Sequence, residues 1–534
     1  MVMVSLDIAF AIVPGLILFL YGIDNFSKEI ERIAGEKFRT LLTKVTKTRV
    51  GGAFLGALVT ATIQSSTATT VIVVGLVGAG VIPFIQSISI IIGANVGTTI
   101  TGQLVALKLT AFAPFFILLG FLLSIFGRKY KFLGKPLFYF GLVFFGLTLI
   151  SQAIEPIKDD PSIVEIFSQL SNIFLAILAG FLFTVVMQSS SVTTGIVVLL
   201  VGGGLLTLEQ GIPLIMGANI GTTSTSLFAA WNMDLFARRA AMAHFLFNVG
   251  GVIIFLPLLP LFSDVVVNFG GSAAQQMANA HTLFNVIIAV IFLIVLRPFT
   301  NLVEKLVPGT EREIVFKTKY LNAHLPKSNQ KAFSLIEKEL QHSLDVTLEM
   351  FKHSMLMLKD GNGKLLRKVS KLESFNDFLD DKISGALIEM SPRELNKKEA
   401  EKTLLLVRIS NATEQLGDTA KNLAFLGETM KESTLHFSHN SLVDLEKVYD
   451  QFEKNLSLIS KYTPVITDKE REQLRKNDVV LRELITAQYK DHMKMLCSKE
   501  TYAGTSFVDA LSLIESANAK IREIRKLSEE YARL

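Results

Sequence analysis

Two long stretches of this 534-residue chain contain no charged residue, and they limit what the chain can fold into. Residues 50–107 and 166–208 lack Lys, Arg, Asp and Glu altogether. Residues 1–300 hold only 16 Lys and Arg and 12 Asp and Glu, whereas residues 301–534 hold 37 and 36. Crossing the hydrocarbon layer takes about 20 apolar residues per helix. The sequence therefore predicts an integral membrane domain over residues 1–300 and a charged domain after it.

Basic residues mark the segments of a membrane protein that stay on the cytoplasmic side, and acidic residues carry little weight in that rule. They gather in segments 28–49 and 128–135, at Arg238 and Arg239, and at Arg297. Lys158 is the only basic residue in segments 155–170 and 263–278, so we expect both segments on the outer side of the membrane. The apolar run at 8–24 lacks a preceding basic region and a cleavage site, so it is interpreted as a retained membrane helix.

This assignment leaves an odd number of crossings in each of two long apolar regions. Residues 50–108 start inside and finish outside, whereas residues 171–230 start outside and finish inside. Each region nevertheless has the length for two apolar segments. Two full crossings would break the charge rule, so we expect at least one re-entrant or broken segment in each region.

An internal repeat appears at a single offset of 124 residues. Residues 64–70 (QSSTATT) return as residues 188–194 (QSSSVTT), and residues 93–99 (GANVGTT) return as residues 217–223 (GANIGTT). The register holds without a gap across both motifs. Because one copy starts inside and the other outside, the repeats are predicted to be inverted, as in many secondary transporters.

Polar motifs at this depth are costly unless their groups are paired or line a wet cavity. Close packing of Ser, Thr and Gly between membrane helices is the structural alternative. The chain has four such polar clusters, in two pairs that match across the repeat, and this favours a binding site over helix packing alone. The Gly-Ala-Asn-x-Gly sequences are expected to let the backbone leave helical geometry. Broken helices then present N–H groups to an anion and carbonyls to a cation.

Two further strings, residues 244–248 (HFLFN) and 281–285 (HTLFN), place His and Asn on one helix face. A buried interhelical hydrogen bond is the favoured interpretation, and a role in proton or substrate handling is the alternative. Both strings follow the second GANxGTT motif, so we expect no symmetric His pair across the repeats. The Ser-rich motifs lack a paired base, and the membrane part has no Cys, His and carboxylate cluster with metal-ligand spacing. Nucleophilic catalysis is therefore not expected.

The paired QSS and GANxGTT motifs, together with the HxxFN strings, resemble those of the type II sodium–phosphate cotransporter family over residues 8–300. The resemblance implies symport of inorganic phosphate driven by sodium ions. Carried over by motif and by hydroxyl chemistry, the implied phosphate-binding residues are Gln64, Ser65, Ser66, Thr67, Gln188, Ser189, Ser190 and Ser191. The implied sodium-binding or supporting residues are Asn95, Thr98, Thr99, Asn219, Thr222 and Thr223. The two copies differ in that Thr67 stands where the second copy has Ser191.

From residue 328 onward, apolar residues recur at intervals of three and four, which indicates amphipathic helices of a bundle. Residues 408–422 (RISNATEQLGDTAKN) resemble the E-R-I-G-D-x-A-x-N string of PhoU-like phosphate-regulatory domains. That resemblance implies that acidic faces bind divalent or iron ions, with Glu373, Asp377, Glu414 and Asp418 as candidate ligands. A solvated carboxylate face is the alternative.

Together these observations predict an all-α polytopic membrane protein of the cytoplasmic membrane, with a cytosolic helical bundle. Its expected parts are a membrane domain 1–300 with repeats 8–127 and 132–262 and an extra helix 279–297, a linker 301–327, and a PhoU-like domain 328–534. The expected function is sodium-coupled phosphate symport with a PhoU-like domain that senses or regulates phosphate status, and a cytosolic regulatory protein is a candidate partner. Phosphate export by the same fold and membrane-anchored phosphate signalling without transport are the alternatives. The lone Cys497 excludes an internal disulfide framework, and no basic block with interleaved aromatics indicates a nucleic-acid partner.

Overall fold

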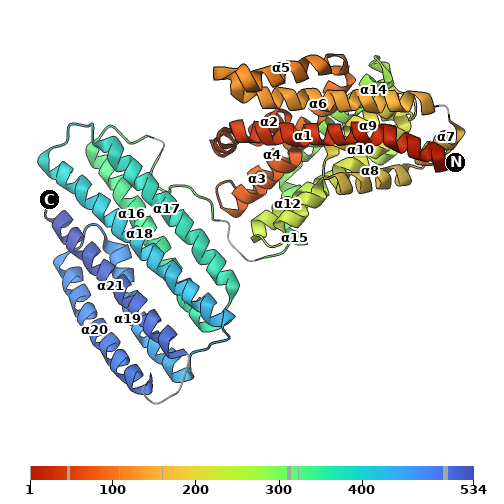
Figure 1. Ribbon diagram of the computed structural model, residues 1–534. Helices are drawn as coiled ribbons and strands as arrows, with labels where there is room; N and C mark the ends of the chain where they lie inside the picture. Colours follow the sequence, from red (N-terminus) through yellow and green to blue (C-terminus); the bar gives the residue numbers. More distant parts are fainter. Residues whose placement is uncertain are drawn as a thin grey trace. The chain divides into compact units, whose positions relative to one another are not determined.

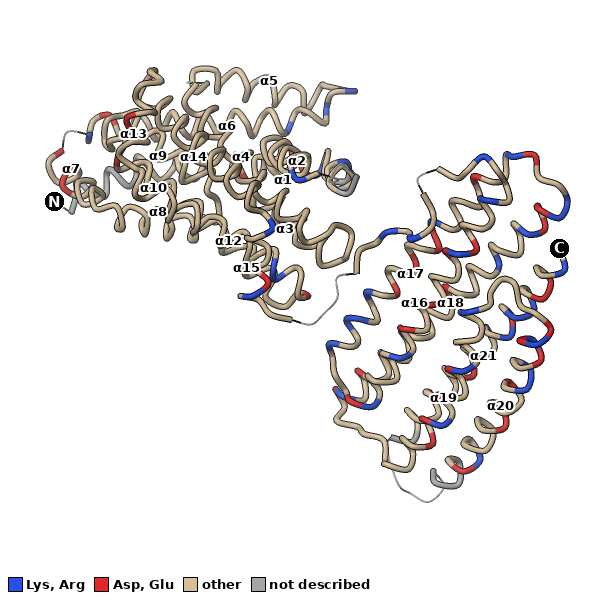
Figure 2. Tube along the Cα trace, turned by 180° about the vertical axis from the view of Figure 1, so that it is seen from behind, with Lys and Arg blue, Asp and Glu red and all other residues tan. Residues whose placement is uncertain are grey.

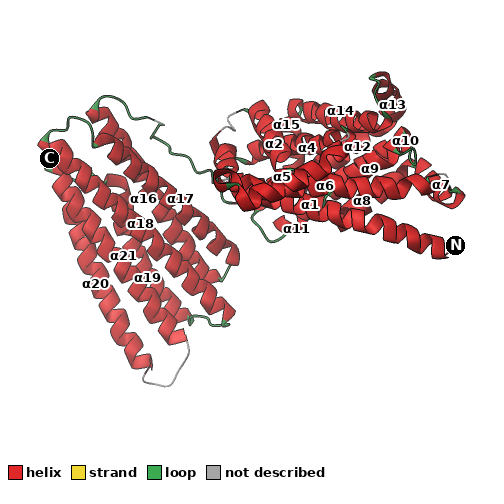
Figure 3. Cartoon of the chain, turned by 45° about the horizontal axis from the view of Figure 1, so that its top comes forward, coloured by secondary structure: helices red, strands yellow, loops and turns green. Residues whose placement is uncertain are grey.

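The structure is a computed structural model that describes residues 2–44, 48–107, 109–158, 160–309, 314–322, 324–496 and 503–534. In these ranges the regular elements are all helices, joined by loops and turns (Figure 3). The chain divides into two compact units, Met1–Glu313 and Ile314–Leu534. The predicted all-α class is confirmed. Cys497 lies outside the described residues.

The first unit, Met1–Glu313, contains fifteen α-helices in its described ranges. The helices of its first half are α1 (Val2–Lys44), α2 (Arg49–Ile63), α3 (Ser66–Gly78), α4 (Phe84–Ala106), α5 (Ala113–Phe126), α6 (Lys131–Ile154) and α7 (Pro161–Ser168). Those of its second half are α8 (Ile173–Met187), α9 (Ser190–Gly202), α10 (Leu208–Gly221), α11 (Thr223–Ala230), α12 (Leu235–Phe255), α13 (Leu259–Asn268), α14 (Ala273–Ile294) and α15 (Leu296–Leu306). Short 3-10 turns are η1 (Leu109–Phe112), η2 (Arg128–Tyr130), η3 (Glu155–Ile157), η4 (Gln169–Ser171) and η5 (Leu256–Leu258).

Five helical segments of the described chain are long and apolar enough to cross a membrane. They are Phe84–Ala106, Leu109–Phe126, Arg128–Ile154, Leu235–Asn268 and Ala273–Ile294. A sixth candidate, Pro161–Ser171 with Ile173–Met187, is bent by 104°. Charged residues are rare over these segments and cluster at their ends (Figure 2). Helices α2, α3 and α9 have only 15, 13 and 13 residues, too few to span the layer alone.

Two basic segments differ from the expected loops. Helix α1 does not end at residue 24 but continues unbroken through 43 residues to Lys44, about 65 Å at 1.5 Å per residue. Its charged second half is therefore a helical extension, and α1 packs along α6 (Figure 1). Arg238 and Arg239 lie inside α12, where Arg239 is buried and its Nε donates to the Val307 carbonyl over 3.1 Å. The buried Arg239 guanidinium thus ties α12 to the end of α15.

The Gly-Ala-Asn-x-Gly sequences were expected to break helices, and this expectation is wrong for the first copy. Residues 93–99 lie within the continuous helix α4. A Cβ on Gly93 would lie 1.8 Å from the Ala53 carbonyl oxygen, and one on Gly217 would lie 1.9 Å from that of Ile177. The glycines therefore let α4 pack directly on α2, and α10 on α8. In the second copy the helix is interrupted only at Thr222, which keeps right-handed helical angles.

The second unit is a helical bundle with its own apolar core. Its helices are α16 (Asn329–Asp360), α17 (Gly363–Met390), α18 (Lys397–Glu432), α19 (His439–Tyr462), α20 (Asp468–Leu496) and α21 (Ala503–Ala532). Helices α16, α17 and α18 pack against one another, as do α19, α20 and α21, and α18 packs on α21. In contrast to the first unit, charges line these helices along their whole length (Figure 2).

Candidate substrate site in the membrane unit

Both QSS motifs interrupt their helices at the glutamine. Gln64 ends α2 with φ 61° and ψ 25°, and Gln188 ends α8 with φ 54° and ψ 21°. Non-glycine residues rarely adopt this left-handed conformation, which costs about 1–3 kcal/mol and is concentrated at functional sites. The next residue, Ser65 or Ser189, is extended and begins the following helix. The predicted broken segments are therefore present, at equivalent residues of both copies.

Each break is held by one threonine pair. In the first copy Thr60 Oγ1 donates to Thr69 Oγ1 over 3.0 Å, and in the second Thr184 Oγ1 and Thr193 Oγ1 lie 2.6 Å apart. All four side chains are buried. The pairs join the helix before each break to the helix after it, so the N-termini of α3 and α9 have fixed positions. These N-termini supply unpaired N–H groups and the positive ends of helix dipoles.

Thr101 of α4 connects the polar motifs of the two copies. Its Oγ1 lies 2.7 Å from Gln64 Oε1 and 3.3 Å from Ser191 Oγ. Gln64 also donates through Nε2 to the Ala61 carbonyl over 2.5 Å, and its side chain is half-buried. One hydroxyl thus joins the first QSS motif to the second, although Gln64 and Ser191 are 127 positions apart in the sequence.

The second glutamine has a different environment. Gln188 is exposed within its unit and, among the described residues, its side chain makes no hydrogen bond, whereas Gln64 makes two. By the repeat offset, the residue equivalent to Thr101 is Thr225. The two equivalent glutamine side chains therefore differ in their hydrogen bonds. Gln64 is bonded to Thr101 and is called closed, whereas Gln188 lacks such a bond in the described residues and is called open.

The asparagines of the GANxGTT motifs form two equivalent amide pairs. Asn95 Nδ2 donates to Asn248 Oδ1 over 2.6 Å, and Asn219 Nδ2 donates to Asn285 Oδ1 over 3.0 Å. All four residues are buried. The sequence led us to expect no symmetric histidine pair across the repeats, and the equivalent pairs seen here are formed by asparagines. Asn248 on α12 thus pairs with α4 of the first copy and Asn285 on α14 pairs with α10 of the second, although both α12 and α14 pack on α4 and on α10.

The two histidines of these strings differ in their partners. His244 Nε2 lies 3.1 Å from Asn95 Oδ1 and His244 Nδ1 lies 3.2 Å from Ser226 Oγ. The predicted buried interhelical hydrogen bond is therefore confirmed for His244. His281 is 1% exposed, and neither of its ring nitrogens has a hydrogen-bond partner in the described part of the chain.

A single residue difference accounts for one of these missing partners. The repeat offset places Gly102 of α4 at the position of Ser226. A Cβ on Gly102 would lie 3.7 Å from His281 Nδ1. Gly102 of the first copy therefore lies beside His281 at the position where Ser226 of the second copy offers His244 a hydroxyl. The apolar pocket beside His281 has no room for a water molecule.

The predicted site residues fall into buried and partly exposed sets. The buried ones are Ser66, Ser190, Ser191, Asn95, Thr98, Thr99, Asn219, Thr222 and Thr223. Ser65, Thr67 and Ser189 are half-buried. The hydroxyls of Thr98, Thr99 and Thr223 bond back to their own helices, whereas Thr70, Thr194 and Thr222 have buried hydroxyls with no partner in the described residues. The site is thus lined by neutral amides and hydroxyls.

Sequence reasoning missed Thr101, Gln103 and Ser226. Thr101 had a usable signal, because it recurs as Thr225 at the repeat offset. Gln103 has none, since position 227 is Leu. Its Nε2 lies 2.9 Å from Thr282 Oγ1 and 3.2 Å from Asn279 Oδ1, so it links α4 to α14.

The acidic candidates of the second unit do gather between α17 and α18. Burial and the carboxylates of Glu373 and Asp418 raise the pKa of Asp377 to about 6, and burial and Asp418 raise the pKa of Glu414. Lys421 Nζ, however, lies 2.8 Å from Glu373 Oε1. No group of three or more His, Cys, Asp or Glu in the described ranges is arranged to hold a metal ion. Metal binding by these residues stays a prediction.

Comparison with known proteins agrees with this geometry. Residues 18–152 and 161–294 match the Na+/Pi-cotransporter family, so the match covers both copies of the repeat. The chain belongs to the Na+/Pi-cotransporter family. Residues 340–426, within the second unit, match the PhoU domain. The chain is therefore a membrane protein of a phosphate-transporter family that carries a PhoU domain.

Three relatives illustrate the range of this family. The uncharacterized protein YqeW of Bacillus subtilis is 31% identical over 264 residues, covering 49% of this chain and 86% of that protein. The putative inorganic phosphate export protein YjbB of Escherichia coli K12 is 24% identical over 450 residues, covering 83% and 82%. The sodium-dependent phosphate transport protein 2C of the mouse is 43% identical over 115 residues, covering 20% and 19%. No solved structure matches the chain.

Proposed function

We propose that this protein is a sodium-coupled symporter of inorganic phosphate in the cytoplasmic membrane. The observation that carries the proposal is the bond network of Thr101, which joins Gln64 of one repeat to Ser191 of the other. Transporters built from repeats bind substrate at the interface between the copies. A hydroxyl that touches both QSS motifs lies at such an interface, in a family whose members carry phosphate.

Phosphate would be held by the ends of α3 and α9 and by the QSS side chains. Each helix begins after the serine that follows the glutamine, and its first-turn N–H groups are donors for an anion, apart from the Ala68 N–H, which the Ser65 side chain caps. Hydroxyls and amides add further donors without a fixed positive charge. The residues proposed to contact phosphate are Gln64, Ser65, Ser66, Thr67, Gln188, Ser189, Ser190 and Ser191.

Sodium ions would offset the charge of the bound anion, because these motifs contain no Lys or Arg. The proposed sodium-binding or supporting residues are Asn95, Thr98, Thr99, Asn219, Thr222 and Thr223. The buried, unpartnered hydroxyl of Thr222 supports this assignment, since Na+ binds neutral oxygen ligands. The sodium-dependent name of the mouse relative agrees with it.

Phosphate export is the second candidate function, favoured by the name of the Escherichia coli relative. The same site can release phosphate outward, because the direction of a carrier follows the gradients of its substrates. A membrane-anchored signalling role without transport is disfavoured, because both QSS motifs are complete.

The PhoU domain is proposed to lie in the cytoplasm and to regulate transport, through a cytosolic partner or through divalent or iron ions on the acidic face of α17 and α18. Manganese or iron titration, read as a rise in melting temperature, tests the metal assignment. An Asp377→Asn variant that keeps the full rise contradicts it. A cysteine introduced within 155–170 tests the orientation, since it should react with a membrane-impermeant reagent added outside.

The deciding experiment is uptake of labelled phosphate into proteoliposomes with and without an inward sodium gradient. We expect uptake to require the gradient, and Gln64→Ala and Gln188→Ala each to abolish it while the protein stays folded. Equal uptake with and without sodium contradicts the coupling. Wild-type uptake by both variants contradicts the site. Reversing the gradient in preloaded vesicles measures export by the same protein.

A further inference from the structure

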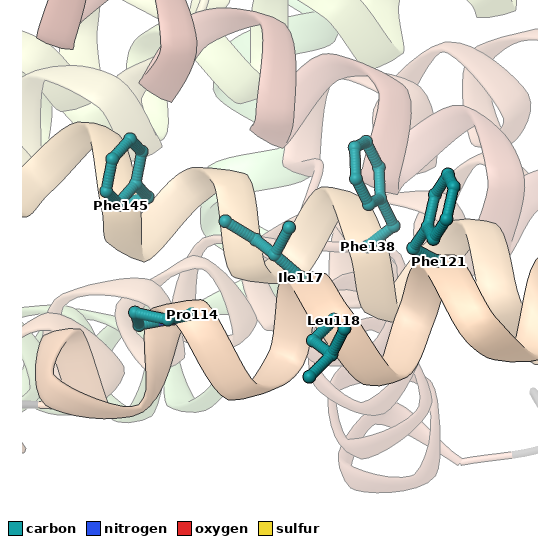
Figure 4. A pocket seen from close by; sticks show the side chains of 6 residues that line it. All are labelled: Pro114, Ile117, Leu118, Phe121, Phe138 and Phe145. Atoms are coloured by element: carbon teal, nitrogen blue, oxygen red, sulfur yellow. The ribbon is translucent and has the colours of Figure 1, made fainter.

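Helices α5 and α6 form an apolar groove on the surface of the first unit. It has a volume of about 330 Å³ and is lined by Pro114, Ile117, Leu118, Phe121, Phe138 and Phe145 (Figure 4). The segment Leu109–Phe126, which contains α5, is the least buried of the five straight membrane-crossing candidates, with 11% of its apolar stretch covered within its unit. The two helices approach closely because Gly120 and Gly141 face the partner helix. The groove therefore lies on the outward face of the unit, where an acyl chain can reach it.

Basic residues stand at one end of this groove. Arg128, Lys129, Lys131 and Lys135 occupy the turn between α5 and α6 and the first turns of α6, and all are exposed. Segment 126–135 contains no Asp or Glu. Lys135 contacts Glu29 at 3.7 Å. The other three make no ion pair in the part of the chain that the structure describes. Figure 2 shows these basic residues at the tip of an otherwise uncharged helix pair.

The residues that line the groove and the basic residues follow one another along the same two helices. On α6, Lys131, Lys135, Phe138 and Phe145 follow spacings of four, three and seven, which place them on one helix face. The groove residue Phe121 precedes Arg128 by seven positions, about 10 Å along a helix, and Pro114 precedes it by about 21 Å. Half of a bilayer core is about 15 Å thick. The groove therefore covers the depth of one leaflet and the charges lie at the level of the headgroups.

Exposed aromatic residues border the same basic turn. Phe126, Tyr130 and Phe132 have 72%, 57% and 49% of their surface exposed within the unit. Aromatic side chains gather at the membrane interface, where a ring can meet both headgroups and acyl chains. This places the turn at the interface independently of its charge.

We propose that the α5–α6 groove and its basic turn bind one anionic phospholipid. An acyl chain lies along Leu118, Phe121 and Phe138, and the phosphate group contacts Arg128, Lys129 and Lys131. Charge complementarity selects an anionic lipid over a zwitterionic one, because each basic residue near a negative membrane surface strengthens binding about fivefold. The site is separate from the QSS motifs, so the proposal is independent of the transported substrate.

The test is native mass spectrometry of the full-length protein, titrated with phosphatidylglycerol or phosphatidylcholine of identical acyl chains. We expect phosphatidylglycerol to bind about 125-fold more tightly, from about fivefold for each of the three basic residues. Lys129→Gln/Lys131→Gln should remove most of that preference, by about 25-fold, and leave phosphatidylcholine binding unchanged. Leu118→Trp, which fills the groove, should weaken binding of both lipids.

Matched controls separate this site from general effects. Lys305→Gln removes an exposed lysine on α15, and Leu178→Trp enlarges an exposed leucine on α8. Both should bind lipid as the wild type does, and size-exclusion profiles should show that all variants are folded. Equal affinity for the two lipids overturns the proposal, as does a loss of binding in the control variants. A change in oligomeric state in Leu118→Trp with unchanged lipid binding assigns the groove to a second copy and also overturns it.

Discussion

Thr101 Oγ1 lies 2.7 Å from Gln64 Oε1, and this bond fixes the side chain of a glutamine whose backbone is left-handed. The same hydroxyl lies 3.3 Å from Ser191 of the other repeat. A residue outside every recognised motif thus joins the two halves of the candidate site. Gln64 is hydrogen-bonded to Thr101, whereas the Gln188 side chain has no hydrogen bond in the described residues. The two equivalent QSS motifs therefore have different side-chain conformations in one structure.

Replacing Thr101 tests this role. Thr101→Val keeps the shape of the side chain but removes the hydroxyl, leaving Gln64 Oε1 and Ser191 Oγ without that partner. An unmet buried polar group costs about 1–3 kcal/mol. We expect phosphate uptake to fall at least tenfold in Thr101→Val and to stay near wild type in Thr101→Ser.

The matched control is Thr148→Val on α6, which removes a hydroxyl that bonds only to the Phe144 carbonyl of its own helix. Its uptake should equal that of the wild type. If Thr101→Val also transports normally, Thr101 does not position the site.

The amide pairs predict a specific pattern of energetic coupling. Asn95 with Asn248, and Asn219 with Asn285, should each show a coupling free energy of about 1 kcal/mol in double-mutant cycles with alanine, the range measured for hydrogen bonds inside membranes. Unfolding in mixed micelles measures it. The crossed cycle of Asn95 with Asn285 serves as the control and should give coupling near zero. Coupling of similar size in the crossed cycle would contradict the pairing of Asn248 with Asn95 and of Asn285 with Asn219.

The sequence predicted the broken helices at Gln64 and Gln188 because amides and hydroxyls in an uncharged apolar stretch have few stable arrangements. It failed at Gly93 and Gly97, because a glycine that permits a bend and a glycine that permits a close helix contact look the same in sequence. The same limit applied to Arg239, where the sequence shows a charge but not the Val307 carbonyl that it bonds. Contacts between distant segments, such as that of Thr101 with Ser191, leave no mark on local periodicity.

The Gly102 and Ser226 positions predict that His281 can gain a partner. Gly102→Ser would place a hydroxyl near His281 Nδ1, but its Cβ would lie 3.2 Å from the Thr194 methyl carbon. Thr194→Ser removes that methyl group. We therefore expect Gly102→Ser/Thr194→Ser to be more stable than Thr194→Ser by about 1 kcal/mol, the net value of one hydrogen bond. Thermal unfolding in detergent measures the difference.

The reciprocal change provides the control for this pair. Ser226→Gly removes the hydroxyl from His244 and should destabilise the protein by about 1 kcal/mol. In a His281→Phe background, the hydroxyl that Gly102→Ser introduces has no imidazole to meet, so the gain should vanish. A gain that persists in that background assigns it to the helix rather than to the histidine.

Glu339 anchors the segment that enters the second unit. Its buried carboxylate accepts hydrogen bonds from the N–H groups of Lys319, Tyr320 and Leu321 at 3.0, 2.6 and 2.9 Å. Burial alone would raise the pKa of Glu339, but the hydrogen bonds from His342 and from these N–H groups lower it below its ordinary value of 4.5. Above that pH the ionised carboxylate stabilises the unit in full, and this stabilisation is lost as the pH falls through the lowered folded-state pKa.

We therefore expect Glu339→Gln to lower the free energy of unfolding of the second unit by about 2–3 kcal/mol at pH 7, because the amide group turns one acceptor into a donor facing N–H groups. Hydrogen exchange at residues 319–321 should quicken in the variant. The stability difference from the wild type should shrink as the pH falls below 4.5. Glu401→Gln, on the exposed surface of α18, should change neither quantity. A difference that stays constant from pH 7 to pH 3 would show that the carboxylate charge does not hold this segment.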